Sequence, residues 1–497
     1  MLRSILRGGA AAVIVVGLAA WPATARAEAM AVTSEAATAL TDTLDIGLRQ
    51  WLPSEGAKAG WHWAGRPLVT PAGDHFDVDL PALTISGDDG GKIQAGVIKL
   101  TLAPLPDGSW QVGGAVPSRV LMLTADGKAD GEMTIGSQSF SGRWLPALGT
   151  FAKVEATLGD LRAFSAKDST KMEIASLAIR SDLAEQPPGR WSGPGSLTLK
   201  GMTVVDEHGL EVARIGNIAV ESTASGLDLV KLVKAGSSVD PEHHPDLLRN
   251  LIGSFSAKLT IGDTTLNAGK DGGIFSIKEV AAHGGVEGLD GEHSSIGFGY
   301  HHAGLSLEPS PGPREFTPEK AEMDLAIVSL PNAGLWAAVE ALLKPAPGLT
   351  DEQRGNLFSQ AVINALTQAG SRLEIKALSL DTPAAAATLK GAATFDGKAA
   401  FGLVAGLDMV LRGLDSTMKQ LQPAPGAKPD PEVQKTLATL SLAQALGAPG
   451  KDETGRDLRS YKFDLGPDGR IMLNGADMSA VLQSVQAPGG SGQGGKP

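Results

Sequence analysis

The chain contains no cysteine among its 497 residues. Disulfide bonds, cysteine nucleophiles and thiolate metal sites are therefore excluded. The fold must instead be stabilised by burial of apolar surface. A chain of this length can provide that burial, because it is long enough for two or three domains that each enclose a core.

Basic residues are outnumbered, with 43 lysines and arginines against 55 aspartates and glutamates and a formal net charge of −12. An acidic surface repels the phosphate backbone, so we expect no nucleic-acid partner. The same charge opposes adsorption to anionic headgroups. The negative charge does not exclude an apolar surface that binds acyl chains, because such a surface need not approach the charged headgroups.

Familiar catalytic motifs are also lacking: the sequence has no Gly-x-Ser-x-Gly elbow, no His-Glu-x-x-His helix and no phosphate-binding glycine loop. Ser416 and Lys419 have the Ser-x-x-Lys spacing that lets a lysine activate a serine one helical turn away. An exposed helix face is the simpler interpretation of that spacing. We predict that the protein is not an enzyme and has no cofactor. A serine hydrolase centred on Ser416 is the weaker alternative.

The segment from Asp126 to Glu132 begins like a calcium loop, with carboxylates at its first and fifth positions and glycine at its sixth. Lys128 occupies the third position, and Ser137 stands where a bidentate glutamate is needed. This pattern favours a plain turn between strands, with calcium as the minor alternative.

Two adjacent histidine pairs, His243-His244 and His301-His302, suggest a transition metal, because imidazole is its commonest ligand. On a strand, however, His301 and His302 point to opposite faces and cannot bind one ion together. His243 and His244 lie between prolines, which indicates a solvated loop. We therefore predict no metal site.

The N-terminus carries the signature of a secretory signal peptide. Arg3 and Arg7 precede an apolar run from Ala10 to Trp21, and Ala25 to Ala27 fits a signal peptidase site. The run is too short to cross a bilayer, which takes about 20 residues of helix. We expect cleavage after Ala27, a periplasmic location, and a tether to the inner membrane only for uncleaved chains. Cleavage removes three arginines and no acid, which takes the net charge from −12 to −15.

From Phe76 to about Val220 apolar and polar residues alternate, as from Ile98 to Leu102. This pattern is typical of strands with one solvated face. Turn signals at Pro106 to Gly108, Asp126 to Gly127 and His208 to Gly209 each separate two apolar runs. An antiparallel meander is therefore expected.

After Gly226 the apolar spacing becomes helical, and a helical insertion is predicted near 226–252, with strands again from Phe255 to Leu307. Further helices are predicted at 335–343, 357–366, 407–421 and 433–446, a strand at 373–380, and a closing hairpin at 461–473. The predicted organisation is a signal peptide (1–27), an N-terminal β-rich domain (28–308), a proline-rich linker (309–318), a C-terminal α+β domain (319–480) and a flexible tail (481–497). The fold class is a β-rich α+β fold with extended, curved antiparallel sheets and short helical insertions.

Three short segments recur in the same order, which predicts that the two halves are related. They are Met172 to Ile179 with Leu373 to Leu380, Leu199 to Gly201 with Leu389 to Gly391, and Gly226 to Val230 with Gly406 to Val410. Each series reads as two strands followed by Gly-Leu-Asp opening a helix. The alternative is a shared order of elements without common ancestry.

The second series carries a family resemblance. The run from Leu373 through Thr382-Pro383, Leu389 to Gly391 and Phe395 to Gly397 resembles the C-terminal part of AsmA-like envelope proteins. The segment from Tyr461 to Gly475 is similar to the final hairpin of their uncharacterised periplasmic relatives. The resemblance covers about residues 316–480. It implies curved sheets with an apolar inner surface and a role in phospholipid movement or outer-membrane upkeep. The chain is far shorter than the long lipid bridges of that group and has no retained membrane helix, which argues against bridging.

We therefore expect a periplasmic envelope protein that binds or carries phospholipid or another apolar ligand in outer-membrane maintenance. The alternative is a structural scaffold that binds other envelope proteins. Exposed apolar residues on the inner sheet face would favour the ligand hypothesis. Helices packed over that face would favour the scaffold.

Overall fold

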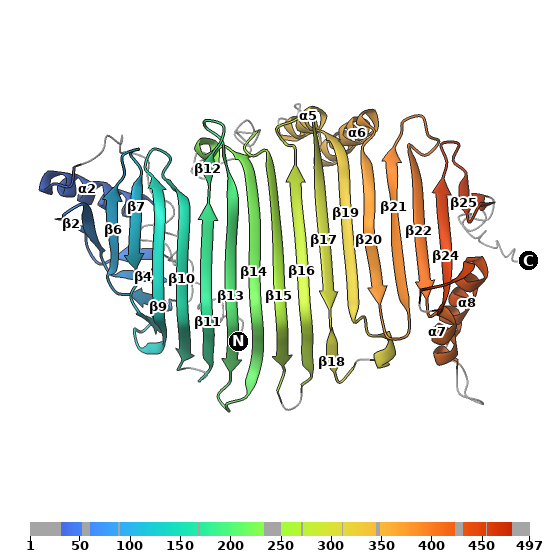
Figure 1. Cartoon of the computed structure of the whole chain (residues 1–497), viewed down its shortest axis with the longest axis horizontal. Coiled ribbons are helices and arrows are strands. Elements are labelled where there is room, and N and C mark those ends of the chain that lie inside the picture. The colour runs from blue at the N-terminus through green and yellow to red at the C-terminus, as the bar shows by residue number, and fades with distance from the viewer. Residues whose placement is uncertain are drawn as a thin grey trace, which may run out of the picture. The chain divides into compact units, whose positions relative to one another are not determined.

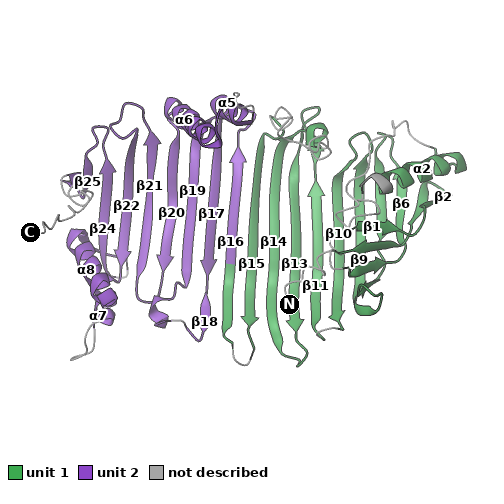
Figure 2. Cartoon of the chain, turned by 180° about the vertical axis from the view of Figure 1, so that it is seen from behind, with its two compact units in different colours: residues 1–279 green, residues 280–497 purple. Residues whose placement is uncertain are grey.

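The computed structural model describes residues 31–51, 60–87, 90–166, 169–232, 250–269, 272–310, 312–343, 348–422, 431–453 and 455–479. The predicted signal peptide (1–27), the predicted tail (481–497) and the pair His243-His244 lie outside the described residues. The chain forms two compact units, residues 1–279 and 280–497 (Figure 2). Every strand pairing given below is antiparallel, and strands far outnumber helices, which confirms the predicted β-rich α+β class (Figure 1).

The first unit begins with one helix, and strands of increasing length follow it. These elements are α2 (Ser34–Trp51), β1 (Gly60–Trp63), β2 (Leu68–Ala72), β3 (His75–Leu80), β4 (Leu83–Ser86), β5 (Lys92–Ala95), β6 (Ile98–Pro104), β7 (Trp110–Ala115), β8 (Arg119–Leu123), β9 (Ala129–Leu145), β10 (Thr150–Ser165), β11 (Lys171–Asp182), β12 (Ala184–Glu185), β13 (Trp191–Val205), β14 (Glu211–Leu227) and β15 (Ser254–Asn267). β16 (Ile274–Glu287) contains the boundary between the units. The three predicted turns lie between β6 and β7, β8 and β9, and β13 and β14, with their glycines in the left-handed region at φ 78°, 81° and 79°.

The sheet of the first unit forks at β9. Along one edge β9 pairs with β10. Along its other edge the N-terminal half pairs with β8 and the C-terminal half with β7. One arm continues from β7 through β6 and β3 to β2, and the other from β8 through β5 and β4 to β1. Sequence alternation predicts the strands but not this fork.

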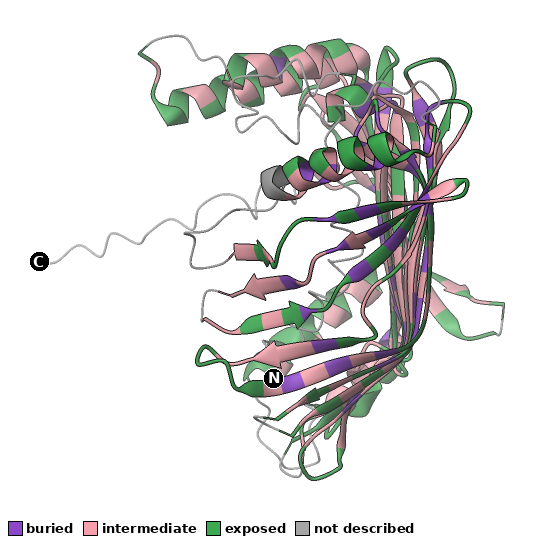
Figure 3. Cartoon of the chain, turned by 90° about the vertical axis from the view of Figure 1, so that its left-hand side faces the viewer, coloured by how far each residue is buried: buried purple, intermediate pink, exposed green. Residues whose placement is uncertain are grey.

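The core of the first unit lies between the two arms of the fork, whose strands carry buried residues (Figure 3). Phe76 and Leu80 of one arm and Leu83 of the other are almost fully buried and belong to one apolar cluster. α2 packs onto this cluster through Leu44, whose exposed fraction is 0%. The helix therefore completes a core that two short-stranded arms could not close by themselves.

The pleat of the long strands inverts along one row that crosses β9, β10, β11, β13, β14 and β15. In β10, Leu158 and Leu161 are both buried although they lie three residues apart. Asp160, between them, has a φ of 51°. The strand pairings immediately before and after this row leave one residue of each strand between them. These residues form the inversion row: Gly136, Asp160, Ala175, Gly201, Gly216 and Asp263.

Glycine is required at three positions of this inversion row, because the residue paired with each of them approaches closely. A Cβ on Gly136 would lie 2.7 Å from the Cβ of Asp160, and a Cβ on Gly216 would lie 2.9 Å from that of Asp263. Gly201, with a φ of 65°, faces Ala175 in the same way. The inversion lets the apolar side chains continue on one face of the sheet along the whole strand.

The opposite face of these strands is polar and carries cross-strand ion pairs. Lys153 contacts Asp182 at 3.3 Å, and Arg180 contacts Glu155 at 3.0 Å. These side chains are at least half exposed, so each pair contributes little to stability. The face is solvated, as the alternation predicts.

The second unit has helices at both ends of its strands (Figure 2). Its elements are β17 (His293–Ala303), β18 (Ser306–Glu308), η1 (Arg314–Phe316), β19 (Lys320–Pro331), α5 (Asn332–Leu343), α6 (Asp351–Ala369), β20 (Arg372–Asp381), β21 (Ala386–Phe395), β22 (Leu403–Arg412), α7 (Leu414–Leu421), α8 (Pro431–Leu446), β23 (Ala448–Lys451), β24 (Asp457–Leu465), β25 (Ile471–Leu473) and β26 (Ala476–Asp477). The long strands pair in the order β17, β19, β20, β21, β22, β24. The proline-rich segment 309–318 connects β18 to β19 inside this unit, so the compact units divide at a different place.

The helices at 335–343, 357–366 and 433–446, the strand at 373–380 and the hairpin at 461–473 are as predicted. The helix predicted at 407–421 is wrong in its first half, where Leu403–Arg412 is β22 and only Leu414–Leu421 is helical. In the 226–252 insertion only Leu229 to Leu232 are described as helical, and residues 250–252 are not. Residues 233–249 lie outside the described part of the chain.

Short strands cover the outer edge of β24. β23 pairs with its first half and β25 with its last residues, while β22 occupies its other edge. β23 has four residues and β25 has three. The last long strand therefore has partners on both sides.

Candidate functional site

One face of the sheet in the second unit is apolar across all of its long strands. Residues paired across neighbouring strands point to the same side, so the register identifies the side chains that share a face. The central row consists of Tyr300, Met323, Leu378, Leu389, Met409 and Tyr461. A second row consists of Phe298, Leu325, Ile375, Gly391, Leu407 and Phe463, and a third of Ile296, Ile327, Leu373, Ala393, Ala405 and Leu465. We call these rows the apolar face.

The other side of the same strands is polar. Next to the central row, the register joins His301, Glu322, Ser379, Thr388, Val410 and Ser460. Such a difference between two faces is expected when only one of them is shielded from water.

Much of the apolar face is nevertheless open. Ile296 and Phe298 on β17 have exposed fractions of 49% and 47%. Leu378 on β20 is 40% exposed. Leu380, two residues further along β20 and on the same face, is 45% exposed. Scattered apolar side chains are normal on protein surfaces, but a contiguous exposed patch marks an interaction site.

Among the described helices, α8 contacts the apolar face at its last strand, while α5 and α6 contact β19. The hydroxyl of Tyr461 donates a hydrogen bond of 2.7 Å to the carbonyl oxygen of Ala443 in α8. Tyr461 is 3% exposed, and this burial raises the pKa of its phenol above the usual value of about 10. The contact between Tyr461 and α8 therefore lies at the opposite end of the strand order from β17.

A buried polar pair extends the face at β17. His302 lies opposite Ala321, beside the central row, and is 8% exposed. Its Nδ1 lies 3.0 Å from the hydroxyl of Tyr300, and its Nε2 lies 3.3 Å from the carbonyl oxygen of Pro318. With the proton on Nε2, both contacts are ordinary hydrogen bonds. The neighbouring His301 lies opposite Glu322 on the other face, so the prediction that the two imidazoles point apart is confirmed.

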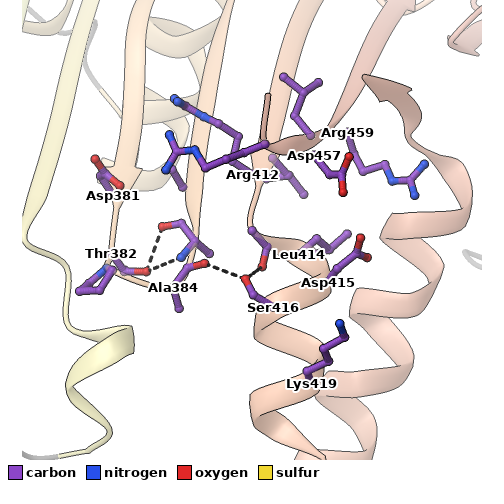
Figure 4. A pocket seen from close by; sticks show the side chains of 17 residues that line it. Asp381, Thr382, Ala384, Arg412, Leu414, Asp415, Ser416, Lys419, Asp457 and Arg459 are labelled. Atoms are coloured by element: carbon purple, nitrogen blue, oxygen red, sulfur yellow. Dashed lines mark hydrogen bonds between the residues drawn. The ribbon is translucent and has the colours of Figure 1, made fainter. Parts of the chain in front are cut away.

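A pocket of about 520 Å³ lies where the strands meet α7 (Figure 4). Its wall combines the turn after β20, the end of β22 with the first turn of α7, and the start of β24. It is rich in charge, with the cations Arg412, Lys419, Arg456 and Arg459 and the carboxylates Asp381, Asp415 and Asp457. The pocket can therefore contact an ion as well as apolar groups.

The charges of this pocket are only partly paired within the protein. Arg456 binds Asp452, which does not line the pocket, at 2.9 Å. Asp415 accepts a hydrogen bond from Gln444. By contrast, among the described residues no carboxylate lies within ion-pair distance of Arg412 or Arg459. These two guanidinium groups keep their donors available for another acceptor.

Ser416 and Lys419 both line the pocket (Figure 4). The Ser416 hydroxyl donates to the carbonyl oxygens of Gly413, at 2.8 Å, and Ala384, at 3.2 Å (Figure 4). Both side chains are exposed, and no hydrogen bond joins them in the described part of the chain. Ser416 is thus held as an ordinary residue of a first helical turn, without a base.

The segment at Asp126 is a turn between β8 and β9, as predicted. Asp126 binds the Nζ of Lys128 at 2.7 Å and accepts a hydrogen bond from the Thr124 hydroxyl. These two contacts, the lysine first, lower the pKa of the Asp126 carboxyl. The residues that the structure describes contain no cluster of three His, Asp or Glu side chains able to hold a metal ion.

No known protein family, curated protein or solved structure matches this chain. The likeness to AsmA-like proteins therefore stays a prediction. Within the described ranges, no helix has both the length and the apolar character needed to cross a membrane.

Sequence reasoning missed Arg412 and Arg459 as site residues. The helical reading of 407–421 placed Arg412 inside a helix, whereas it is the last residue of β22. Arg459 lies in the predicted closing segment as one charge among several. The sequence did contain a signal for these site residues, because each arginine interrupts the pattern of apolar residues near the end of a strand.

Proposed function

We propose that the protein binds an apolar or amphiphilic ligand along the apolar face of the second unit and that it does so without catalysis, as an exported component of the cell envelope. The observation that carries this proposal is the exposure of Ile296, Phe298, Leu378 and Leu380 on that face. A face that served only as the inside of a fold would be covered by other elements.

The energetics of burial favour such a ligand. Each methylene group that leaves water for an apolar surface contributes about 0.8 kcal/mol, so a chain of about ten methylenes offers up to about 8 kcal/mol before the costs of association. The predicted N-terminal signal peptide supports export, and the resemblance to AsmA-like proteins supports a lipid in outer-membrane maintenance.

A scaffold that binds another envelope protein is the second candidate. One observation favours it: the apolar face already accepts a helix, because α8 lies against Tyr461. A helix of a partner could cover β17 to β20 in the same manner.

The deciding experiment is native mass spectrometry with solvent extraction on mature protein purified from its own periplasm without detergent. We expect a stoichiometric amphiphile. Phe298→Asn should lower the fraction of protein that carries this amphiphile. Leu357→Asn should not lower it, because Leu357 is similarly exposed but lies on helix α6 and not on a strand of the apolar face. A ligand-free mass would contradict tight apolar binding and favour the scaffold.

The same sample tests export. Its N-terminal residue should be Glu28, which follows the predicted cleavage site. A mature chain that still begins at Met1 would contradict the signal-peptide prediction.

A further inference from the structure

The central row of the apolar face has a tyrosine at each end, and the two hydroxyls are used differently. Tyr461 on β24 donates its proton to the carbonyl oxygen of Ala443 in α8. Tyr300 on β17 is half-buried, and its hydroxyl lies 3.0 Å from the Nδ1 of His302 on the same strand. Its neighbour on the same face, Phe298, is exposed. Tyr300 therefore lies beside the open part of the apolar face.

The two contacts of His302 determine the direction of the hydrogen bond from Tyr300. The Nε2 of His302 lies 3.3 Å from the carbonyl oxygen of Pro318. Because a carbonyl oxygen only accepts, Nε2 carries the proton of the neutral imidazole. Nδ1 then has only a lone pair, so the Tyr300 hydroxyl must donate to it. The Tyr300 proton is therefore already used, while the Tyr300 oxygen keeps its acceptor positions.

No other group in the described residues donates a hydrogen bond to the Tyr300 oxygen. The three rows of the apolar face also contain no charged residue. An anionic headgroup beside Tyr300 would thus find no cation in these rows and would meet the lone pairs of the phenol oxygen. An uncharged hydroxyl group could instead donate its proton to that oxygen.

We propose that the Tyr300 oxygen accepts a hydrogen bond from an uncharged hydroxyl group of the amphiphile, whose hydrocarbon chain lies on the apolar face beside Phe298 and Leu378. The inference rests on the proposed function, because it takes the apolar face as the site of the chain. It adds the chemical class of the polar group, an alcohol, and its place at β17. Tyr300 then determines specificity, and His302 is a positioning residue that orients the Tyr300 hydroxyl.

The test is equilibrium dialysis of the full mature protein against decanol and against decyl methyl ether. Decanol can donate and accept a hydrogen bond, whereas the ether can only accept. The measured quantity is the ratio of the two affinities, and its change between protein variants cancels the different hydrophobicity of the two ligands. We expect Tyr300→Phe to lower the preference for decanol about fivefold, the usual effect of one hydrogen bond between neutral groups.

His302→Leu is a second test that does not depend on loss of binding. Without the imidazole, the Tyr300 proton is free to be donated to a ligand, so the ether should gain affinity while decanol still binds. Tyr461→Phe is the matched control, since it removes the hydroxyl at the other end of the same row. It should keep the native preference for decanol. Unfolding curves of all three variants check that each is folded.

Other outcomes would overturn the inference in distinguishable ways. A preference that Tyr300→Phe leaves unchanged would refute the alcohol site and leave the proposed function standing. An equal fall in Tyr461→Phe would refute the place of the hydroxyl at β17. An ether that gains nothing in His302→Leu would refute the role of His302. Binding of neither ligand to the native protein would contradict the proposed function itself.

Discussion

The hydroxyl of Tyr461 and the carbonyl oxygen of Ala443, 2.7 Å apart, join the last long strand of the second unit to α8. The phenol ring lies on the apolar face, and Gly447 just after α8 is small enough to let the ring approach. This contact holds α8 against the apolar face at β24.

Tyr461→Phe removes the hydrogen bond and keeps the ring. The Ala443 carbonyl is then left without this donor, so we expect the free energy of unfolding to fall by about 1 kcal/mol. Urea unfolding measures the change. An unchanged midpoint would mean that the ring alone holds α8.

Alkaline pH should weaken the same contact. Burial raises the pKa of Tyr461 above its ordinary value of about 10, so the neutral phenol is favoured in the folded chain. Its contribution is complete below pH 10 and is lost as the pH rises through the folded-state pKa. Stability measured from pH 9 upward should therefore fall more steeply in the native protein than in Tyr461→Phe. Parallel curves would contradict this origin.

The inversion row can be tested with a double-mutant cycle at Gly136 and Asp160. Gly136→Ala places a Cβ 2.7 Å from that of Asp160 and should cost about 1–3 kcal/mol. Asp160→Gly alone should change stability by about 0.5 kcal/mol or less, because glycine adopts a φ of 51° readily. The double variant should recover most of the loss. Additive losses would mean that the two residues do not meet as described.

The role of α2 can be tested on two residues of the same helix. Leu44 is 0% exposed against the core of the first unit, and Ile46 is 55% exposed. Leu44→Ala should lower the free energy of unfolding by about 2–5 kcal/mol and Ile46→Ala by about 0.5 kcal/mol or less. Thermal unfolding of both variants gives the comparison. Equal effects would show that α2 does not contribute to the core.

Local chemistry explains why many elements could be predicted. Gly108, Gly127 and Gly209 each follow residues that favour turns, and each adopts the positive φ that its hairpin needs. α6 begins at a capping box between Thr350 and Gln353. In these segments the neighbouring residues alone determine the local structure.

β22 shows where such reasoning fails. Leu407, Val410 and Leu411 follow one another at helical spacing, yet they lie in a strand between two other strands. A strand with apolar residues on both faces has no period of two, and a short apolar run fits a helix equally well. Only pairing with β21 and β24 decides between the two.

The recurring segments are partly explained by the sheets. Met172 to Ile179 lies in β11 next to β13 with Leu199 to Gly201, and Leu373 to Leu380 lies in β20 next to β21 with Leu389 to Gly391. The third pair differs, because Gly226 and Leu227 end β14 and Leu229 begins a helical turn, whereas Gly406 to Val410 lies inside β22. The prediction that Gly406 opens a helix is therefore wrong. A common origin of the halves stays a prediction.

The candidate site depends on long-range pairing, which no local pattern reveals. Leu411 and Arg459 are 48 positions apart in the sequence and face each other only through the register of β22 and β24. The exposure of Phe298 likewise depends on which helices cover the sheet. The sequence could indicate an apolar face but not its open part.

The short strands beside β24 also bear on how the protein behaves at high concentration. A long strand with a free edge offers a row of amide donors and carbonyl acceptors to another chain, which leads to fibrous growth. β23 and β25 occupy that edge with only four and three residues each, too few to serve as a template for a second sheet. Even with its open apolar face, the second unit is therefore protected against polymerisation at this edge.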